Sequence, residues 1–233
     1  MKPAFLWFFA VLVCLPSLSH AQGPPSLCEP CLFYGGDYNP NDPNSDAFPD
    51  ENTLTHPNSE TYGAVLIPRG HAVSVEGILF QIQFLEQNTV LDPNGATWEI
   101  RTGVKDGSGG TVIASGHGRV AKEATGRTGS GFEYTIRVKL DPPVQLTGGG
   151  AGTIYWLNLT PQCTHESDPL CTGNTYAVSN TTDQVNAFRG GAQAVARIFL
   201  DTPQIDWENA CELGLNGSQC EYLSFGLTGT IIQ

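Results

Sequence analysis

Residues 132–140 read FEYTIRVKL, a stretch in which apolar and polar side chains alternate. The apolar members are Phe132, Tyr134, Ile136, Val138 and Leu140, and the polar members are Glu133, Thr135, Arg137 and Lys139. Successive side chains of a strand point to opposite faces, so the alternation predicts a half-buried β-strand. We expect its apolar row to face a core. We expect its polar row to face solvent, with Glu133 paired to Arg137 or Lys139.

The same alternation of apolar and polar residues recurs in eight further stretches, and the chain shows no convincing helical periodicity. These stretches begin at Tyr62, Ala72, Ala96, Thr111, Gly152, Thr175, Ala194 and Glu221. Turn residues separate many of them, as in Asp141-Pro142-Pro143 and in the glycine-flanked turn expected at Gly116-His117-Gly118. The pattern predicts an all-β fold, an antiparallel β-sandwich of the jelly-roll kind in a single domain with disulfide-stapled loops.

One predicted strand is apolar on both faces. In residues 152–159, GTIYWLNL, Tyr155 and Leu157 share one face while Ile154 and Trp156 share the other. A strand buried on both faces needs a cover on each side. We expect the N-terminal arm to cover its outer face.

The chain divides into three parts. Residues 1–21 have the features of a signal peptide, with Lys2 before a short apolar run and small residues ending at Ala21. Residues 22–60 lack periodicity and are rich in Asp, Asn and Pro, which predicts an irregular arm. Residues 61–233 would form the β-sandwich domain. This division predicts a protein secreted to the extracellular space or the periplasm, with no membrane span in the mature chain.

The chain is acidic. It has 11 basic and 23 acidic residues and a formal net charge of −12. Nucleic-acid binding relies on clustered Lys and Arg, and the sequence spreads its basic residues over many strands and loops, so we expect no nucleic-acid partner. The acidity is typical of a soluble extracellular protein, which we expect to be monomeric.

Six cysteines follow the predicted signal peptide, and they are spaced as three short-range pairs. The pairs are Cys28 with Cys31, Cys163 with Cys171, and Cys211 with Cys220. An even count in an exported chain predicts disulfides, and we expect each bridge to be local, although spacing leaves the connectivity open. A redox dithiol or half a zinc site at Cys28 and Cys31 would need a helix start or two further ligands. The sequence shows neither.

Two segments are candidates for ligand binding. Asp37, Asn39 and Asn41 alternate in the arm as the oxygen ligands of Ca²⁺ would, but the glycine and the final glutamate of a calcium loop are missing. A solvated turn is the competing interpretation. Trp207 lies in the predicted loop PQIDWENAC, where its ring would stack on a sugar or, alternatively, plug the end of the sandwich.

Catalytic patterns are weak. Ser115 lies near His117, yet no G-x-S-x-G motif exposes a nucleophile. Glutamates such as Glu99 and Glu133 are placed on strands, but a glycosidase is recognised by the separation of its carboxyl groups. We therefore expect a non-catalytic module that is structural or binds carbohydrate or a cell-surface component, with no cofactor other than calcium. The alternative is a secreted carbohydrate-active hydrolase or lyase with carboxylates on the concave sheet.

Three stretches carry a resemblance. Residues 97–104 read TWEIRTGV, residues 109–116 read GGTVIASG, and residues 152–159 read GTIYWLNL. In this spacing the stretches resemble the strands of a loosely defined set of secreted bacterial β-sandwich proteins, over roughly Tyr34 to Thr160. The resemblance implies export and a β-sandwich fold. It transfers no active-site residue.

Overall fold

In the computed structural model, the structure describes Cys28, residues 31–38, 52–53, 59–84, 95–105, 107–129, 131–162, 175–178, 180–181, 195–199, 205–209 and 222–232. These residues form strands and turns, and no helix occurs among them. Within the same ranges, nothing meets the length and hydropathy that a membrane-crossing helix requires.

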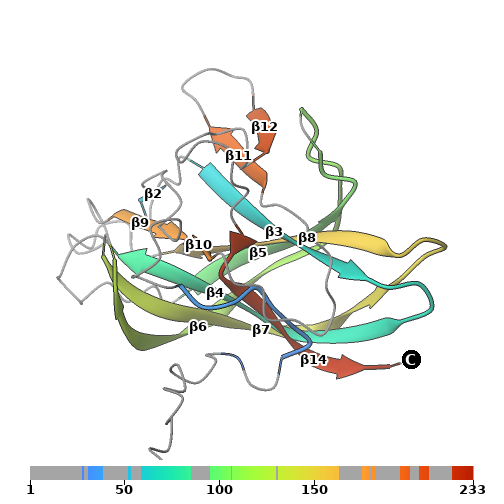
Figure 1. Cartoon of the computed structure of the whole chain (residues 1–233), viewed down its shortest axis with the longest axis horizontal. Helices are drawn as coiled ribbons and strands as arrows, with labels where there is room; N and C mark the ends of the chain where they lie inside the picture. Colours follow the sequence, from blue (N-terminus) through green and yellow to red (C-terminus); the bar gives the residue numbers. More distant parts are fainter. Residues whose placement is uncertain are drawn as a thin grey trace, which may run out of the picture.

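The strands, most of them labelled in Figure 1, join almost entirely into one antiparallel sheet. Their bounds are β1 (Phe33–Tyr34), β2 (Asn52–Thr53), β3 (Ser59–Ile67), β4 (Ala72–Phe84), β5 (Gly95–Thr102), β6 (Thr111–Thr128), β7 (Phe132–Thr147), β8 (Thr153–Gln162), β9 (Thr175–Val178), β10 (Asn180–Thr181), β11 (Val195–Phe199), β12 (Ile205–Asn209), β13 (Tyr222–Leu223) and β14 (Phe225–Ile231). The order is β1-β14-β4-β7-β6-β5-β8-β3-β11-β12, with β9 also on β4, β2 on β9, and β10 paired with β13 apart. Each of the nine predicted stretches contains a strand. The all-β, antiparallel prediction is confirmed.

The long strand β6 belongs to two parts of the sheet. Its residues 111–119 pair with β5, whereas most of residues 120–128 pair with β7. We call β1, β14, β4, β7 and residues 120–128 the β4 half, and residues 111–119, β5, β8, β3, β11 and β12 the β5 half. The sheet curls at β6 until it is nearly closed, because Gly63 of β3 lies against the Phe225 ring of β14 although five strands separate them in the order.

The main hydrophobic core fills the space between the two halves. Phe80, Ile136 and Val138 enter it from the β4 half, and Ile100 and Leu157 enter it from the β5 half. All five are at most 2 % exposed. Burial of a large apolar side chain contributes about 1.5 to 3 kcal/mol, so this shared core holds the curl closed.

Strand β7 continues where the sequence predicts a turn. Residues 140–143, including the cis Asp141–Pro142 bond, bulge out of the ladder opposite Glu76, and pairing with β4 resumes at Val144. Prolines lack the N–H that a ladder needs, and a bulge accommodates them without ending the strand. The turn predicted at Gly116-His117-Gly118 is likewise wrong, because these residues lie inside β6.

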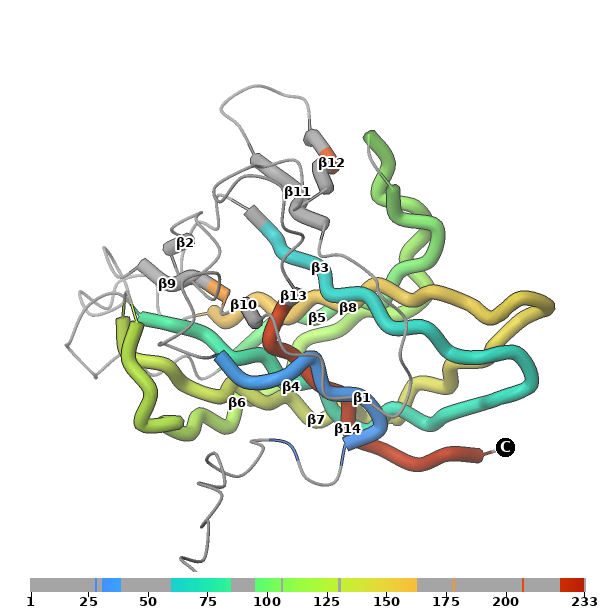
Figure 2. Tube along the Cα trace, viewed as in Figure 1, coloured from blue at the N-terminus to red at the C-terminus, as the bar shows by residue number. Residues whose placement is uncertain are grey.

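The polar row of β7 is covered at one end of the strand. Glu133 and Thr135 are each 1 % exposed, so the prediction that they face solvent is wrong, whereas Lys139 is exposed. Their cover is the N-terminal segment, Cys28 and residues 31–38, which runs along the outer face of the β4 half and adds β1 to β14 (Figure 2). The segment belongs to the predicted irregular arm, yet these residues are ordered against the sheet.

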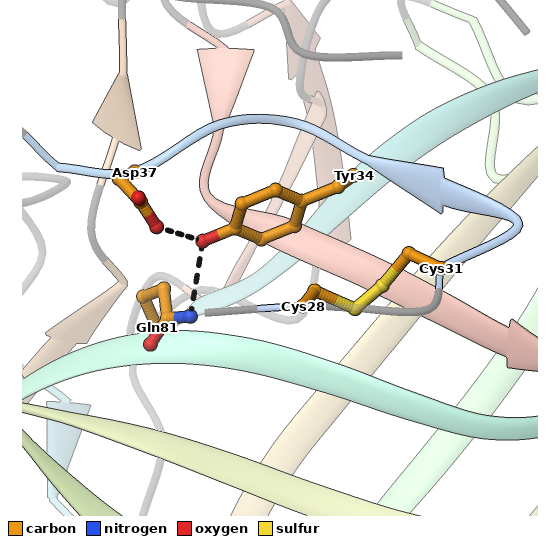
Figure 3. The surroundings of a disulfide bond; sticks show 5 residues. All are labelled: Cys28, Cys31, Tyr34, Asp37 and Gln81. Atoms are coloured by element: carbon orange, nitrogen blue, oxygen red, sulfur yellow. Dashed lines mark hydrogen bonds between the residues drawn. A yellow bond between two sulfur atoms is a disulfide. The ribbon is translucent and has the colours of Figure 1, made fainter. Parts of the chain in front are cut away.

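One hydrogen bond within this segment and two to the sheet position it, and Figure 3 draws those that involve Tyr34. The hydroxyl of Tyr34 donates to Asp37, and the amide of Gln81 donates to the Tyr34 hydroxyl oxygen at 3.3 Å. The Ser224 hydroxyl donates to the Gly36 carbonyl. A buried polar group needs such a partner, and the Gln81 side chain has partners in Tyr34 and Thr135 beneath the segment.

The outer face of β8 has a different cover from the one expected. Trp156 is 9 % exposed and packs in a second cluster with Tyr62, Ala64, Val104 and Trp207. Val104 follows β5 and Trp207 lies in β12. Of the predicted arm, Cys28 and residues 31–38 lie on the β4 half and do not cover this face, whereas residues 39–51 and 54–58 lie outside the described residues.

Candidate functional site

A groove of about 560 Å³ opens where β6 parts from β7. Residues 132–138 of β7 pair with β6, but beyond Val138 the neighbouring residues 111–119 of β6 pair with β5 instead. Among the described strands, none pairs with this edge of β7 after Val138. The bulge at Asp141–Pro143 forms one lip of the groove, and β6 forms the other.

Small residues on the inner side of β6 keep the groove open. A Cβ atom at Gly116 would lie 2.7 Å from Cζ2 of Trp98, and one at Gly118 would lie 2.5 Å from Cγ1 of Val138. Such distances are shorter than real Cβ contacts, so larger residues would force these neighbours aside. The indole of Trp98, which is 8 % exposed, therefore reaches the groove lining past the two glycines.

Exposed polar side chains stand around this aromatic lining. The outward positions of β6 carry Ser115, His117 and Arg119, and β7 contributes Lys139 and Asp141. The His117 ring lies over the backbone of Gly95, where an added Cβ would be 2.6 Å from Nε2. The residues that line the groove thus include an aromatic residue, a hydroxyl residue, a histidine, two cations and a carboxylate, all on strands. Side chains held on strands are positioned more precisely than side chains on loops.

The structure places Trp207 in strand β12 and not in a loop, which corrects the predicted location. Its ring is 7 % exposed and packs against the Tyr62 ring, with a centroid distance of 5.1 Å, while the Arg101 guanidinium lies 5.0 Å from its centroid. Gly109 lies against the indole as well. These neighbours cover the ring, so its environment is that of a packing residue.

Two carboxylates meet at Tyr62 in the same region. The oxygen of its hydroxyl lies 3.0 Å from Oε2 of Glu60 and 3.0 Å from Oε2 of Glu99. The two carboxylate oxygens are therefore at most about 6 Å apart, a limit that includes the separation of about 5 to 5.5 Å in retaining glycosidases. Arg101 Nε donates to Glu99 at 2.6 Å. Burial, together with the charges of Glu60 and Glu99, raises the pKa of Tyr62.

The predicted calcium site is described at one of its three residues. The Asp37 carboxylate accepts the Tyr34 hydroxyl and pairs with Arg127 at 2.9 Å. Asn39 and Asn41 lie outside the described residues, so calcium binding stays a prediction. Where the structure describes the chain, no three His, Cys, Asp or Glu side chains gather as a metal site would require.

One of the three expected disulfides is described. Cys28 and Cys31 are bonded, with Cα atoms 5.5 Å apart, at the start of the N-terminal segment (Figure 3). Cys28 packs beside Leu79 of β4 and Tyr34. Cys163, Cys171, Cys211 and Cys220 lie outside the described residues, and their pairing stays a prediction.

Comparison with protein families, with curated proteins and with solved structures gives no match. The resemblance to secreted bacterial proteins therefore stays a prediction.

Sequence reasoning missed the groove, although it considered several of its residues. Ser115 and His117 entered only as a weak catalytic pattern, and Trp98, which belongs to the main core cluster, only as part of a strand. The signals were Gly116 and Gly118, two positions apart on the inner face of a strand, and the paired prolines of β7. Only the three-dimensional structure shows that these features line one groove.

Proposed function

We propose that the protein is a secreted, non-catalytic binding module that takes an extracellular glycan into the groove between β6 and β7. The single observation that carries this proposal is the groove itself, with Trp98 in its lining and His117 and Asp141 at its rim. Sugars present apolar ring faces and many hydroxyls, and ligand sites for such molecules combine apolar lining with a few placed polar groups.

The proposal includes the finer architecture and the location of the protein. We take the curled sheet as a β-sandwich of jelly-roll type in which β6 is shared by both layers. The core between the β4 half and the β5 half supports this assignment. The features of residues 1–21 support export, and the Cys28–Cys31 bond suits an oxidising compartment.

A panel of neutral and acidic extracellular polysaccharides tests the binding proposal. We expect the wild-type protein to bind at least one of them, and His117→Ala combined with Asp141→Asn to weaken that binding at least tenfold. Both side chains are exposed, so the fold should tolerate their replacement. His71→Ala, at an exposed turn away from the groove, is the matched control and should bind as the wild type does.

Each outcome of this assay decides the proposal. Failure to bind any polysaccharide, or equal binding by the double variant, overturns it. The same samples are assayed for newly formed reducing ends, which hydrolysis of the polysaccharide would produce. This tests the alternative function, because the carboxylates of Glu60 and Glu99 lie near each other. Release of reducing ends that Glu60→Gln abolishes would replace the binding module with the alternative, a carbohydrate-active hydrolase.

A further inference from the structure

A second cavity, of about 360 Å³, lies on the outer face of the β4 half beside the groove. The strand register builds it. One row across the sheet runs from Thr228 through Gly77 to Lys139, and the next runs from Leu79 through Arg137 to Ala121. Small residues at Gly77 and Ala121 form the floor, and longer side chains stand around them.

Three cations gather at this cavity. Arg119, Arg137 and Lys139 line it, with Glu76 as the one carboxylate among its described lining residues. The chain has only 11 basic residues against 23 acidic ones, so three cations in one hollow stand out from the charge of the whole protein. The sequence predicts scattered basic residues, and the register of β6 and β7 corrects this for these three.

The cavity and the groove adjoin, because Arg119 and Lys139 line both. The groove lies on one side of these two side chains, at the bulge of β7. The cationic cavity lies on the outer face of the β4 half, where its lining residue Leu79 also packs against Cys28 of the N-terminal segment. A chain-like ligand in the groove would therefore bring its next unit close to the three cations.

We propose that the ligand is an acidic glycan whose carboxylate or sulfate groups bind among Arg119, Arg137 and Lys139. This inference rests on the proposed function and names the class of its substrate. Arginine offers a planar fork of donors that matches carboxylate and sulfate oxygens, and lysine adds a point charge. A local positive site also attracts a polyanion that the acidic remainder of the surface repels, so it selects where the ligand binds.

The experiment compares three probes by isothermal titration calorimetry. Heparin serves as a sulfated glycan, polygalacturonate as a carboxylated glycan, and dextran as a neutral one. We expect the wild-type protein to bind at least one acidic glycan at least tenfold more tightly than dextran. Arg119→Gln with Lys139→Gln should lose at least tenfold in that affinity, and Arg137→Gln should lose several-fold.

The variant Arg69→Gln/Lys105→Gln controls for the effect of removing two positive charges from the protein. Both residues are exposed and lie outside the two cavities. This control should retain wild-type affinity. The dependence of log Kd on log salt should be flatter for Arg119→Gln/Lys139→Gln than for the control, because fewer ion pairs form. Unchanged melting temperatures establish that each variant is folded.

The outcomes separate this inference from the proposed function. The proposal of an acidic ligand is wrong if dextran binds as tightly as both acidic glycans, or if the control and cavity variants lose equal affinity. Either result still allows the groove to bind a glycan. If His117→Ala/Asp141→Asn binds the acidic glycan as tightly as the wild type does, the groove is not the binding site, and the cationic cavity remains as the site. If inorganic sulfate binds as tightly as heparin, no glycan contact contributes and the inference fails.

Discussion

At the scale of single residues, the buried tyrosines carry the clearest electrostatic signature. Tyr62 is fully buried beside Glu60 and Glu99, and Tyr34 is 3 % exposed beside Asp37. Burial is the main cause that raises the pKa of each above the ordinary value of 10.0, and the neighbouring carboxylates raise it further. Both hydroxyls therefore keep their protons at a pH at which an unfolded chain loses them.

This predicts a loss of stability above pH 10. Below the unfolded pKa of about 10, folded and unfolded states hold the same tyrosine protons, so neither tyrosine contributes a pH dependence. Above it, the unfolded state releases protons that the folded state retains, and each tyrosine lowers the unfolding free energy by about 1.4 kcal/mol per pH unit. Tyr62→Phe should remove one such contribution, measured by urea unfolding from pH 7 to pH 11.

The same variants also have an expected stability at neutral pH. Tyr62→Phe loses the hydroxyl contact with the carboxylates, which should reduce stability at pH 7 by about 1 kcal/mol. Tyr34→Phe/Tyr62→Phe should flatten the alkaline decline further, since the two residues lie in separate clusters. A decline in both variants as steep as in the wild type would show that these tyrosines do not cause it.

At the scale of elements, the sequence correctly predicted several strands and which face of each is buried in the core, but it did not predict what covers the opposite face. The alternation in β4, β5 and β7 correctly predicted strands and the inner row of Ile136, Val138 and Leu140. It failed for the outer row at Glu133, because alternation shows that two faces differ and not what covers the polar one. Here the cover comes from residues about 100 positions earlier, whose sequence has no strand rhythm.

The Cys28–Cys31 bond should hold this cover in place. Replacement of both cysteines by serine should lower stability by about 2 kcal/mol, because the unfolded chain regains the freedom of a short loop. The loss should be local. The amides of Leu32 and Gly35, which donate to Leu227 and Phe225 at 2.8 Å, should exchange faster with deuterium.

The matched reference for the exchange measurement is the backbone N–H of Gln81, which donates to the backbone carbonyl of Ser224 at 2.8 Å on the same sheet. Its exchange should change less than that of Leu32 and Gly35. Equal acceleration at all three amides would show that the bond stabilises the whole sheet and not the N-terminal segment.

At the scale of the whole molecule, the curl brings together residues that no local pattern relates. Gly63 and the Phe225 ring touch across the core from opposite sides of the strand order. Gly63→Ala should cost about 2 kcal/mol, because its methyl group would overlap the ring and push the two halves apart. In a Phe225→Leu background the same substitution should cost clearly less. Urea unfolding of the four proteins in this cycle gives the coupling, and additive costs would contradict the contact.

The candidate site belongs to this same scale, which explains why the sequence could not reveal it. Arg119 belongs to β6, while Arg137 and Lys139 belong to β7, and their meeting depends on the register between the strands. A shift of one residue would turn a side chain to the other face. The groove further depends on β6 changing partners after residue 119, a property of the sheet and not of either strand.

The position of β14 has a consequence for how the chain reaches this structure. This strand comes last in sequence order, yet it lies between β1 and β4, and the Ser224 hydroxyl binds a carbonyl 188 residues earlier. Such distant pairings make folding slow, because long loops must close before the contacts stabilise them. The edge of β4 stays open and β1 has no strand to join until residues 225–231 have been synthesised. Assembly of this part of the sheet must therefore follow the synthesis of β14.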